Sequence, residues 1–228
     1  TRNINFGTTS LGFNYNTFSS ISSGGASTGM YNSVTGAGQI NVEGSFTGNS
    51  ITAGNVATGT TVAYGIHNYI SGSGGINFDG LFGGTSSGTG NTLTVNGTST
   101  VYGMYNQADA GNIAFGGAFS YNKITASATA SGTANSYGMW NSVSSGTVAI
   151  AGNFNNNDIE SSTTLGTAYG IWNYITATNS NANSINFAGS FTANAIKATS
   201  SNTSAFGLYN SIVSAATSGK INFAGIFG

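Results

Sequence analysis

The side chains that could carry out acid–base or metal chemistry are few. The chain has one histidine, His67, and five acidic residues. Glu43 and Asp79 form the best candidate pair, because each stands just before the glycine of a repeated phrase and stacked repeats would bring them about 5 Å apart. Hydrolysis of a glycosidic bond uses two such carboxylates. The equivalent position of the other repeats tolerates small residues, which is typical of an outward position, and it is occupied by Gly116, Ala151, Ala188 and Ala224.

The remaining candidates for chemistry are weaker. Asp158 and Glu160 flank Ile159, and exposure to solvent explains them. His67 takes a position that is aromatic in the other repeats, so a stacked ring is the simpler interpretation, and one histidine cannot form a multi-histidine metal site. The lack of Cys excludes thiolate ligands and disulfides, and Gly-rich stretches such as SGSGG lack the lysine of a phosphate-binding loop. We therefore expect no catalytic residue, no metal, no cofactor and no enzymatic activity.

The composition argues against nucleic acid as a partner and against a transmembrane helix. Only 4% of the residues are charged, with four Lys+Arg against five Asp+Glu, so the chain has no surplus of positive charge for nucleic acid. No run of about 18 apolar residues predicts a transmembrane helix. The 14 Phe, 11 Tyr and two Trp argue against disorder despite 36 Gly and many Ser, Thr and Asn. Because the chain starts at Thr1 without a signal segment, we expect a mature form or an excised fragment.

One phrase occurs six times, as in YGMWNSV and YGIWNYI, and its glycines recur at intervals of 36, 38, 35, 32 and 37 residues. This period indicates a repeat architecture. The repeat glycines are Gly29, Gly65, Gly103, Gly138, Gly170 and Gly207. Two residues later comes an aromatic column of Tyr31, His67, Tyr105, Trp140, Trp172 and Tyr209. The next position never varies, and its residues are Asn32, Asn68, Asn106, Asn141, Asn173 and Asn210.

A second phrase, such as INFAGSFTANAI, alternates with the first and completes a unit of about 36 residues. Both phrases have the period-two alternation of β-strands. In the first phrase, this alternation predicts one face with Tyr169, Ile171, Asn173 and Ile175 and an opposite face with Gly170, Trp172 and Tyr174. A second, partial asparagine column consists of Asn49, Asn122, Asn157 and Asn194, with Asn16 as an extension and an interruption at Gly84-Thr85.

We predict an all-β chain, a single repetitive domain over residues 1–228, because the sequence lacks a helical apolar stripe and is rich in Gly, Thr and Asn. Stacked identical units would form a β-solenoid of six to seven units, in which each asparagine passes an amide hydrogen bond to the next layer. We favour one layer per unit. Two shorter coils per unit, giving about twelve layers, and an antiparallel β-barrel remain as alternatives.

The paired phrases YGIWN and INFAGSFTANAI, with their Cys-free, Gly/Asn/Ser/Thr-rich surroundings, resemble the β-helical passenger regions of bacterial autotransporters and related surface adhesins. The resemblance covers essentially the whole chain. It implies an exported rod that serves as a stalk or adhesive surface. No translocation barrel or adhesin loop is recognisable, which leaves the export route open.

We therefore expect a structural, extracellular or cell-surface repeat protein that forms a rod or a fibre for adhesion or matrix. Both termini fall inside the repeat pattern, so we expect either a piece of a longer repeat protein or head-to-tail association of identical chains. Two alternatives remain. A glycan-binding adhesin module would use exposed aromatic rings, and a membrane β-barrel would place the polar Asn, Ser and Thr in its lumen.

Overall fold

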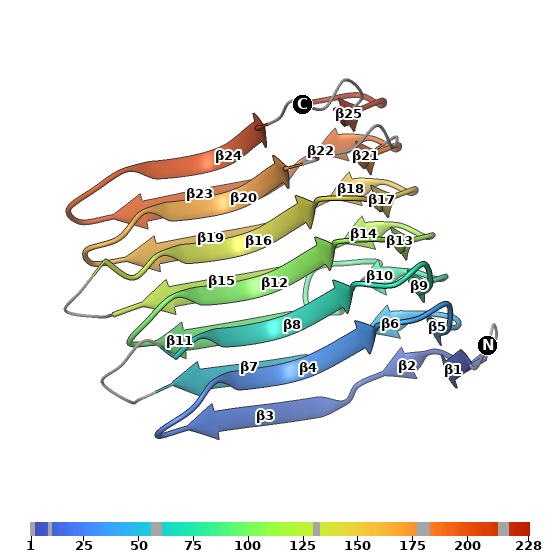
Figure 1. The fold of residues 1–228 in the computed structure, drawn as a ribbon, viewed down its shortest axis with the longest axis horizontal. Helices are drawn as coiled ribbons and strands as arrows, with labels where there is room; N and C mark the ends of the chain where they lie inside the picture. Colours follow the sequence, from blue (N-terminus) through green and yellow to red (C-terminus); the bar gives the residue numbers. More distant parts are fainter. Residues whose placement is uncertain (1–2, 9–10, 56–60, 130–132, 177–182, 214–218) are drawn as a thin grey trace.

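The chain winds into a β-solenoid in which all named strands pair in parallel and each repeat unit makes one turn (Figure 1). This computed structural model describes residues 3–8, 11–55, 61–129, 133–176, 183–213 and 219–228. The prediction of an all-β solenoid with one layer per unit is confirmed. The antiparallel alternative and the arrangement with two coils per unit are both wrong, because the two phrases form different sides of the same turn.

Each turn contributes one strand to each of four sheets. The short sheet consists of β1 (Asn3–Phe6), β5 (Gln39–Val42), β9 (Gly75–Phe78), β13 (Asn112–Phe115), β17 (Thr147–Ile150), β21 (Ser184–Phe187) and β25 (Lys220–Phe223). The corner sheet, with two residues per strand, consists of β2 (Phe13–Asn14), β6 (Phe46–Thr47), β10 (Phe82–Gly83), β14 (Phe119–Ser120), β18 (Phe154–Asn155) and β22 (Phe191–Thr192).

The other two sheets are wider and lie against each other. The medium sheet consists of β3 (Thr17–Ser22), β7 (Ser50–Asn55), β11 (Thr92–Gly97), β15 (Lys123–Ala128), β19 (Asp158–Thr163) and β23 (Ala195–Ser200). The long sheet consists of β4 (Ser27–Val34), β8 (Ala63–Ile70), β12 (Val101–Ala108), β16 (Ser136–Val143), β20 (Ala168–Ile175) and β24 (Ala205–Ile212). No helix in the described ranges is long and apolar enough to span a membrane.

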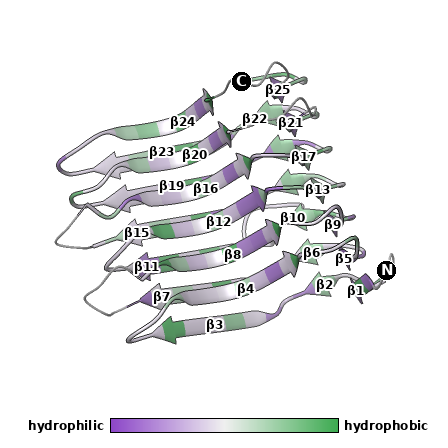
Figure 2. Ribbon diagram, in the orientation of Figure 1, coloured by the Kyte–Doolittle hydropathy of each residue, from purple (hydrophilic) through white to green (hydrophobic). Residues whose placement is uncertain are grey.

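The register places like residues over like residues. Asn106 of β12, for example, pairs with Asn68 of β8 on one side and with Asn141 of β16 on the other. In Figure 2, the hydrophilic colour recurs near the arrowheads of β4, β8 and β12, the part of each strand that carries its repeated asparagine. The unit is therefore repeated because each turn is the template on which the next one pairs.

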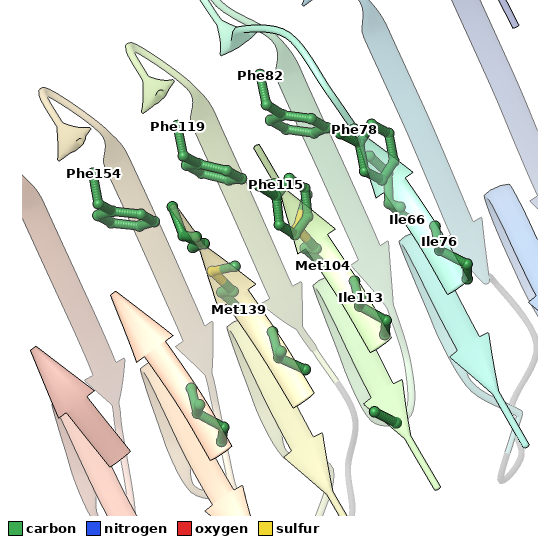
Figure 3. Close-up of a cluster of buried hydrophobic side chains, with 14 of the residues drawn as sticks. Ile66, Ile76, Phe78, Phe82, Met104, Ile113, Phe115, Phe119, Met139 and Phe154 are labelled. Carbon is green, nitrogen blue, oxygen red and sulfur yellow. The ribbon is translucent and has the colours of Figure 1, made fainter. Parts of the chain in front are cut away.

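The core is a continuous stack of phenylalanine rings beside columns of aliphatic side chains. Phe82 and Phe119 lie 4.8 Å apart at an interplanar angle of 8°, and Phe78 meets Phe82 edge-on at 89° (Figure 3). The stack runs through the six turns and on to Phe227, and it consists of Phe13, Phe46, Phe82, Phe119, Phe154, Phe191 and Phe227. Burial of each inner ring of the stack stabilises the fold by about 1.5–3 kcal/mol, and each stacked pair adds about 0.5–1.5 kcal/mol.

The repeat glycines lie where the long sheet approaches the medium sheet. A Cβ atom on Gly170 would lie 2.5 Å from the Gly207 oxygen in the next turn and 2.5 Å from Ile196 Cγ2 on the opposite sheet. Gly138 has the same surroundings, with Gly170 and Ile159 at 2.5 Å. Glycine at this column therefore allows a close approach between sheets and between turns that any larger residue would prevent.

The same glycine corrects the predicted faces of the first phrase. Tyr169 was predicted to share a face with Ile171, but it points outward while Ile171 is buried. Gly170 and Ile171 are consecutive and both buried, so the alternation shifts by one residue at the glycine. A residue without a side chain permits this shift, since two successive full side chains could not both enter the core.

Candidate functional site

The most regular polar feature is a buried ladder of asparagine amides inside the long sheet. The Nδ2 of each asparagine donates a 2.8 Å hydrogen bond to the Oδ1 of the asparagine in the next turn, from Asn32 through Asn68, Asn106, Asn141 and Asn173 to Asn210. The four middle members have no exposed surface. The predicted ladder is confirmed in all six turns.

The ladder has a direction, since every Nδ2 donor points toward the C-terminal end of the solenoid. Each middle amide both accepts one such bond and donates one. A buried amide without partners costs about 1–3 kcal/mol. The bonds of the ladder remove this cost only when the asparagines of successive turns lie over each other, so the ladder fixes the register. A strand that slipped by one residue would bring Trp140 or Ser142, for example, to the position of Asn141 and break both bonds.

A second ladder lies at the turn between the corner sheet and the medium sheet. The expected interruption at Gly84-Thr85 is wrong, because Asn91 takes the position instead. Asn49 Nδ2 donates to Asn91 Oδ1 at 3.1 Å, and Asn91 Nδ2 donates to Asn122 Oδ1 at 3.0 Å. Its six members, one in each turn, are Asn16, Asn49, Asn91, Asn122, Asn157 and Asn194.

Segment 84–90 explains why this position was missed. Its residues form a local turn, in which Thr89 Oγ1 accepts bonds from the backbone N–H groups of Thr85 and Ser86. The segment leaves the solenoid between Gly83 and Asn91 and returns in register. Counting from Phe82 therefore points to the wrong residue, whereas the Asn-x-Leu of Asn91 and Leu93 matches the Asn-x-Ile of the other units.

The second ladder is bonded more densely than the first. Both the backbone N–H and the Nδ2 of Asn122 donate to Asn157 Oδ1, at 3.0 and 3.1 Å, and Asn157 Nδ2 also donates to the Phe119 oxygen at 2.9 Å. The residue before the asparagine has a positive φ in most turns, 56° at Tyr121 and 53° at Ala193. This left-handed residue aims the amide along the axis.

The outer face of the long sheet carries two adjacent columns of aromatic rings. The predicted column stacks through His67, Tyr105 and Trp140, and Trp140 lies 4.7 Å from Trp172 at 7°. Tyr31 and Tyr209 continue it at the two ends with tilted or edge-on rings. The second column was missed because its tyrosine was assigned to the inner face, and it consists of Tyr64, Tyr102, Tyr137, Tyr169 and Phe206.

Rings of the two columns also stack on each other, as at Tyr169 and Trp172, whose centroids lie 4.7 Å apart. Most of the rings are only partly exposed, and Tyr137 is buried. Burial raises the pKa of Tyr102 and Tyr105 far above the usual range, and it raises that of Tyr137 to about 12. These phenols therefore stay neutral at physiological pH and contribute packing rather than acid–base chemistry.

His67 is one of the stacked rings. It lies 4.6 Å from Tyr64 and 4.9 Å from Tyr105, nearly parallel to both. Burial lowers the pKa of His67 to about 4, and a hydrogen bond with Gln107 opposes this shift. Its Nε2 is buried and has no hydrogen-bond partner among the described residues. A neutral imidazole held between phenol rings fits the structural interpretation of this position.

The acidic candidates lie on the outer surface. Glu43 is half-buried and Asp79 is exposed, and both follow strands of the short sheet. Glu160 forms an ion pair of 3.6 Å with Lys197 in the next turn, and both side chains are well exposed. Within the ranges that the structure describes, no three His, Cys, Asp or Glu side chains gather as a metal site would require.

Comparison with protein-family models, with curated proteins and with solved structures found no match.

Proposed function

We propose that this chain is a structural protein of the cell surface or extracellular space, whose rod serves adhesion or matrix formation. The observation that carries the proposal is the first asparagine ladder, in which five successive amide–amide bonds, four of them buried, join all six turns. The most regular positions of the chain hold register between layers. Repeated positions that serve the stacking of turns favour a structural role for the protein.

The second part of the proposal is head-to-tail association. The first turn exposes Ile4, at 54% of its surface, although Ile40 at the same position of the next turn is buried. The opposite end exposes Ile212 and Phe227, at 47 and 61%, whereas Ile175 and Phe191 at the same positions of the preceding turn are buried. Strand edges with exposed large apolar residues favour pairing with another chain. In the interior, each such edge is covered by a turn of the same kind.

A glycan-binding adhesin is the second candidate, and the two outer aromatic columns favour it. Sugar rings pack against the faces of aromatic side chains, however, and here neighbouring rings cover each other's faces at 4.6–5.1 Å in the middle turns. The edges that remain outside suit a glycan less well. A glycan-array screen would separate the two proposals, because the structural proposal predicts no saturable binding.

Sedimentation velocity over a concentration series, with electron micrographs of the same samples, tests the structural proposal. We expect larger species to grow with concentration and to appear as short rods or fibres of constant width. Ile4→Lys is a suitable variant, since it places a charge on the uncovered edge at a position that is already 54% exposed, and it should reduce the association. Isolated monomers at high micromolar concentration would contradict the proposal.

A further inference from the structure

The two tryptophans of the chain form one stacked pair on the outer face of the long sheet. Trp140 of β16 and Trp172 of β20 take the same position in adjacent turns, and their ring centroids lie 4.7 Å apart at 7°. Figure 1 shows β16 and β20 as neighbours within the long sheet. The two indoles are thus in direct face-to-face contact, and a charge on one ring can be shared by the other.

Phenol rings surround this pair. Tyr105 lies 4.9 Å from Trp140 on the side of the preceding turn, and Tyr169 lies 4.7 Å from Trp172 within the same strand. Tyr137 contacts both indoles, at 4.9 and 5.5 Å. The faces of aromatic rings carry negative partial charge and attract cations. The surroundings of the pair therefore favour a positive charge on the indoles.

Neither indole N–H group has a proton acceptor beside it. The Nε1 atoms of Trp140 and Trp172 are buried, and neither has a hydrogen-bond partner among the residues that the structure describes. An indole that has lost one electron is a radical cation, and it normally releases its Nε1 proton to water. In this pair the release has to wait until the ring edge opens locally. The oxidised pair therefore keeps its positive charge.

The neighbouring tyrosines do not compete for the oxidising equivalent. A phenol becomes a stable radical only when it also loses its proton. Burial raises the pKa of Tyr102 and Tyr105 far above the usual range, and it raises that of Tyr137 to about 12. Asn135 Nδ2 donates to Tyr137 Oη at 3.2 Å, so this phenol oxygen has an N–H donor beside it rather than a base. The charge therefore remains on the indoles.

We propose that Trp140 and Trp172 form a one-electron redox site, which takes an oxidising equivalent from a small neutral radical and holds it as a radical cation shared by the two indoles. The radical accepts one electron from the π system of the pair and becomes an anion, and no bond to hydrogen breaks. A reductant that supplies one electron restores the pair. Both rings are partly exposed at the outer face, so a small radical can reach them. The site lies inside one chain and does not depend on the association of chains.

Pulse radiolysis with the azide radical as the oxidant tests the proposal on the whole chain. We expect the absorption of the indole radical cation, together with a near-infrared band that arises when two stacked rings share a charge. The cation should last at least about tenfold longer than that of N-acetyltryptophanamide, because local opening must precede the loss of its proton. A neutral indole radical that forms as fast as in the free compound would overturn the proposal.

The variants Trp140→Tyr and Trp172→Tyr separate the pair from its single members. Tyrosine occupies this position in the adjoining turns, at Tyr105 and Tyr209, so both variants should keep the stack. Each variant should lose the near-infrared band. Tyr64→Phe is the control on the same face, two turns from Trp140, and it should keep the band. A band that survives either tryptophan substitution, or an unaltered chain without the band, would contradict the shared charge.

The double variant, with both tryptophans replaced by tyrosine, gives the signal of the tyrosines alone. Exposed phenols such as Tyr15 and Tyr31, at 75 and 56% of their surface, contribute to this signal. Subtraction of the double variant's spectrum from that of the unaltered chain isolates the indole signal. A difference spectrum without an indole radical would overturn the proposed site. Circular dichroism verifies that each variant folds.

Discussion

Asn106 Nδ2 donates a 2.8 Å hydrogen bond to Asn141 Oδ1, although 35 residues separate them in the chain and neither has exposed surface. The bond is one of a series that repeats in every turn. The bond joins successive turns rather than neighbours in the sequence, so it forms and stabilises the chain only when the turns are correctly stacked. The consequences can be tested at single positions.

Asn141→Ala should lower the free energy of unfolding by about 2–5 kcal/mol, since it leaves both the Asn106 donor and the Asn173 acceptor without a partner. Ser144→Ala is the matched control, because the Ser144 hydroxyl donates long bonds to Asp109, at 3.3 and 3.4 Å, and the substitution leaves the backbone bond of Ser144 in place. It should cost less than about 1 kcal/mol. Urea denaturation followed by circular dichroism measures both, and equal losses would contradict the role of the ladder.

Gly138→Ala should destabilise the chain by about 3 kcal/mol or more, because the new Cβ would lie 2.5 Å from both the Gly170 oxygen and Ile159 Cγ2. Gly36→Ala is the control, since a Cβ atom there has no neighbour within 4 Å. The control should change the thermal midpoint little. A tolerated Gly138→Ala would mean that the two sheets can move apart.

Ala193→Gly should stabilise the chain by about 1 kcal/mol, because Ala193 has a φ of 53°, where an L-residue is strained and glycine is not. Ala195→Gly, two residues later in the extended strand β23, should cost about 0.5–1 kcal/mol for the opposite reason. Chemical denaturation of the two variants should therefore give shifts of opposite sign. Shifts of the same sign would show that the turn strain is absent.

His67 should make stability depend on pH between about 6.5 and 4. Its pKa in the folded chain is about 4, below the ordinary value of 6.5, so the unfolded chain binds the proton more readily. Stability should fall as the pH decreases through this window, by up to about 3 kcal/mol, and this loss should be complete below about pH 4.

The His67→Phe variant provides the comparison, because a phenyl ring can stack between Tyr64 and Tyr105 but cannot be protonated. The difference in unfolding free energy between the two chains should change over this pH range. A constant difference would place His67 in a solvated environment rather than between the rings.

The features that could be predicted from the sequence are those in which like residues recur at a constant interval. The Asn141 ladder and the one-turn period followed from this rule, since stacking places equal positions over each other. Asn91 did not, because the segment before it lengthens one turn without altering the register. Tyr169 was placed on the wrong face because alternation assumes a regular strand, and Gly170 shifts it.

The distance between spin labels at Ser33→Cys and Ser211→Cys within one chain, diluted with unlabelled protein, tests the central claim most directly. These positions lie five turns apart in one column, so the stacking of one turn per unit predicts a Cα separation of about 24 Å. A separation of about 48 Å, as two coils per unit would give, would contradict the stacking of equivalent side chains on which the account depends.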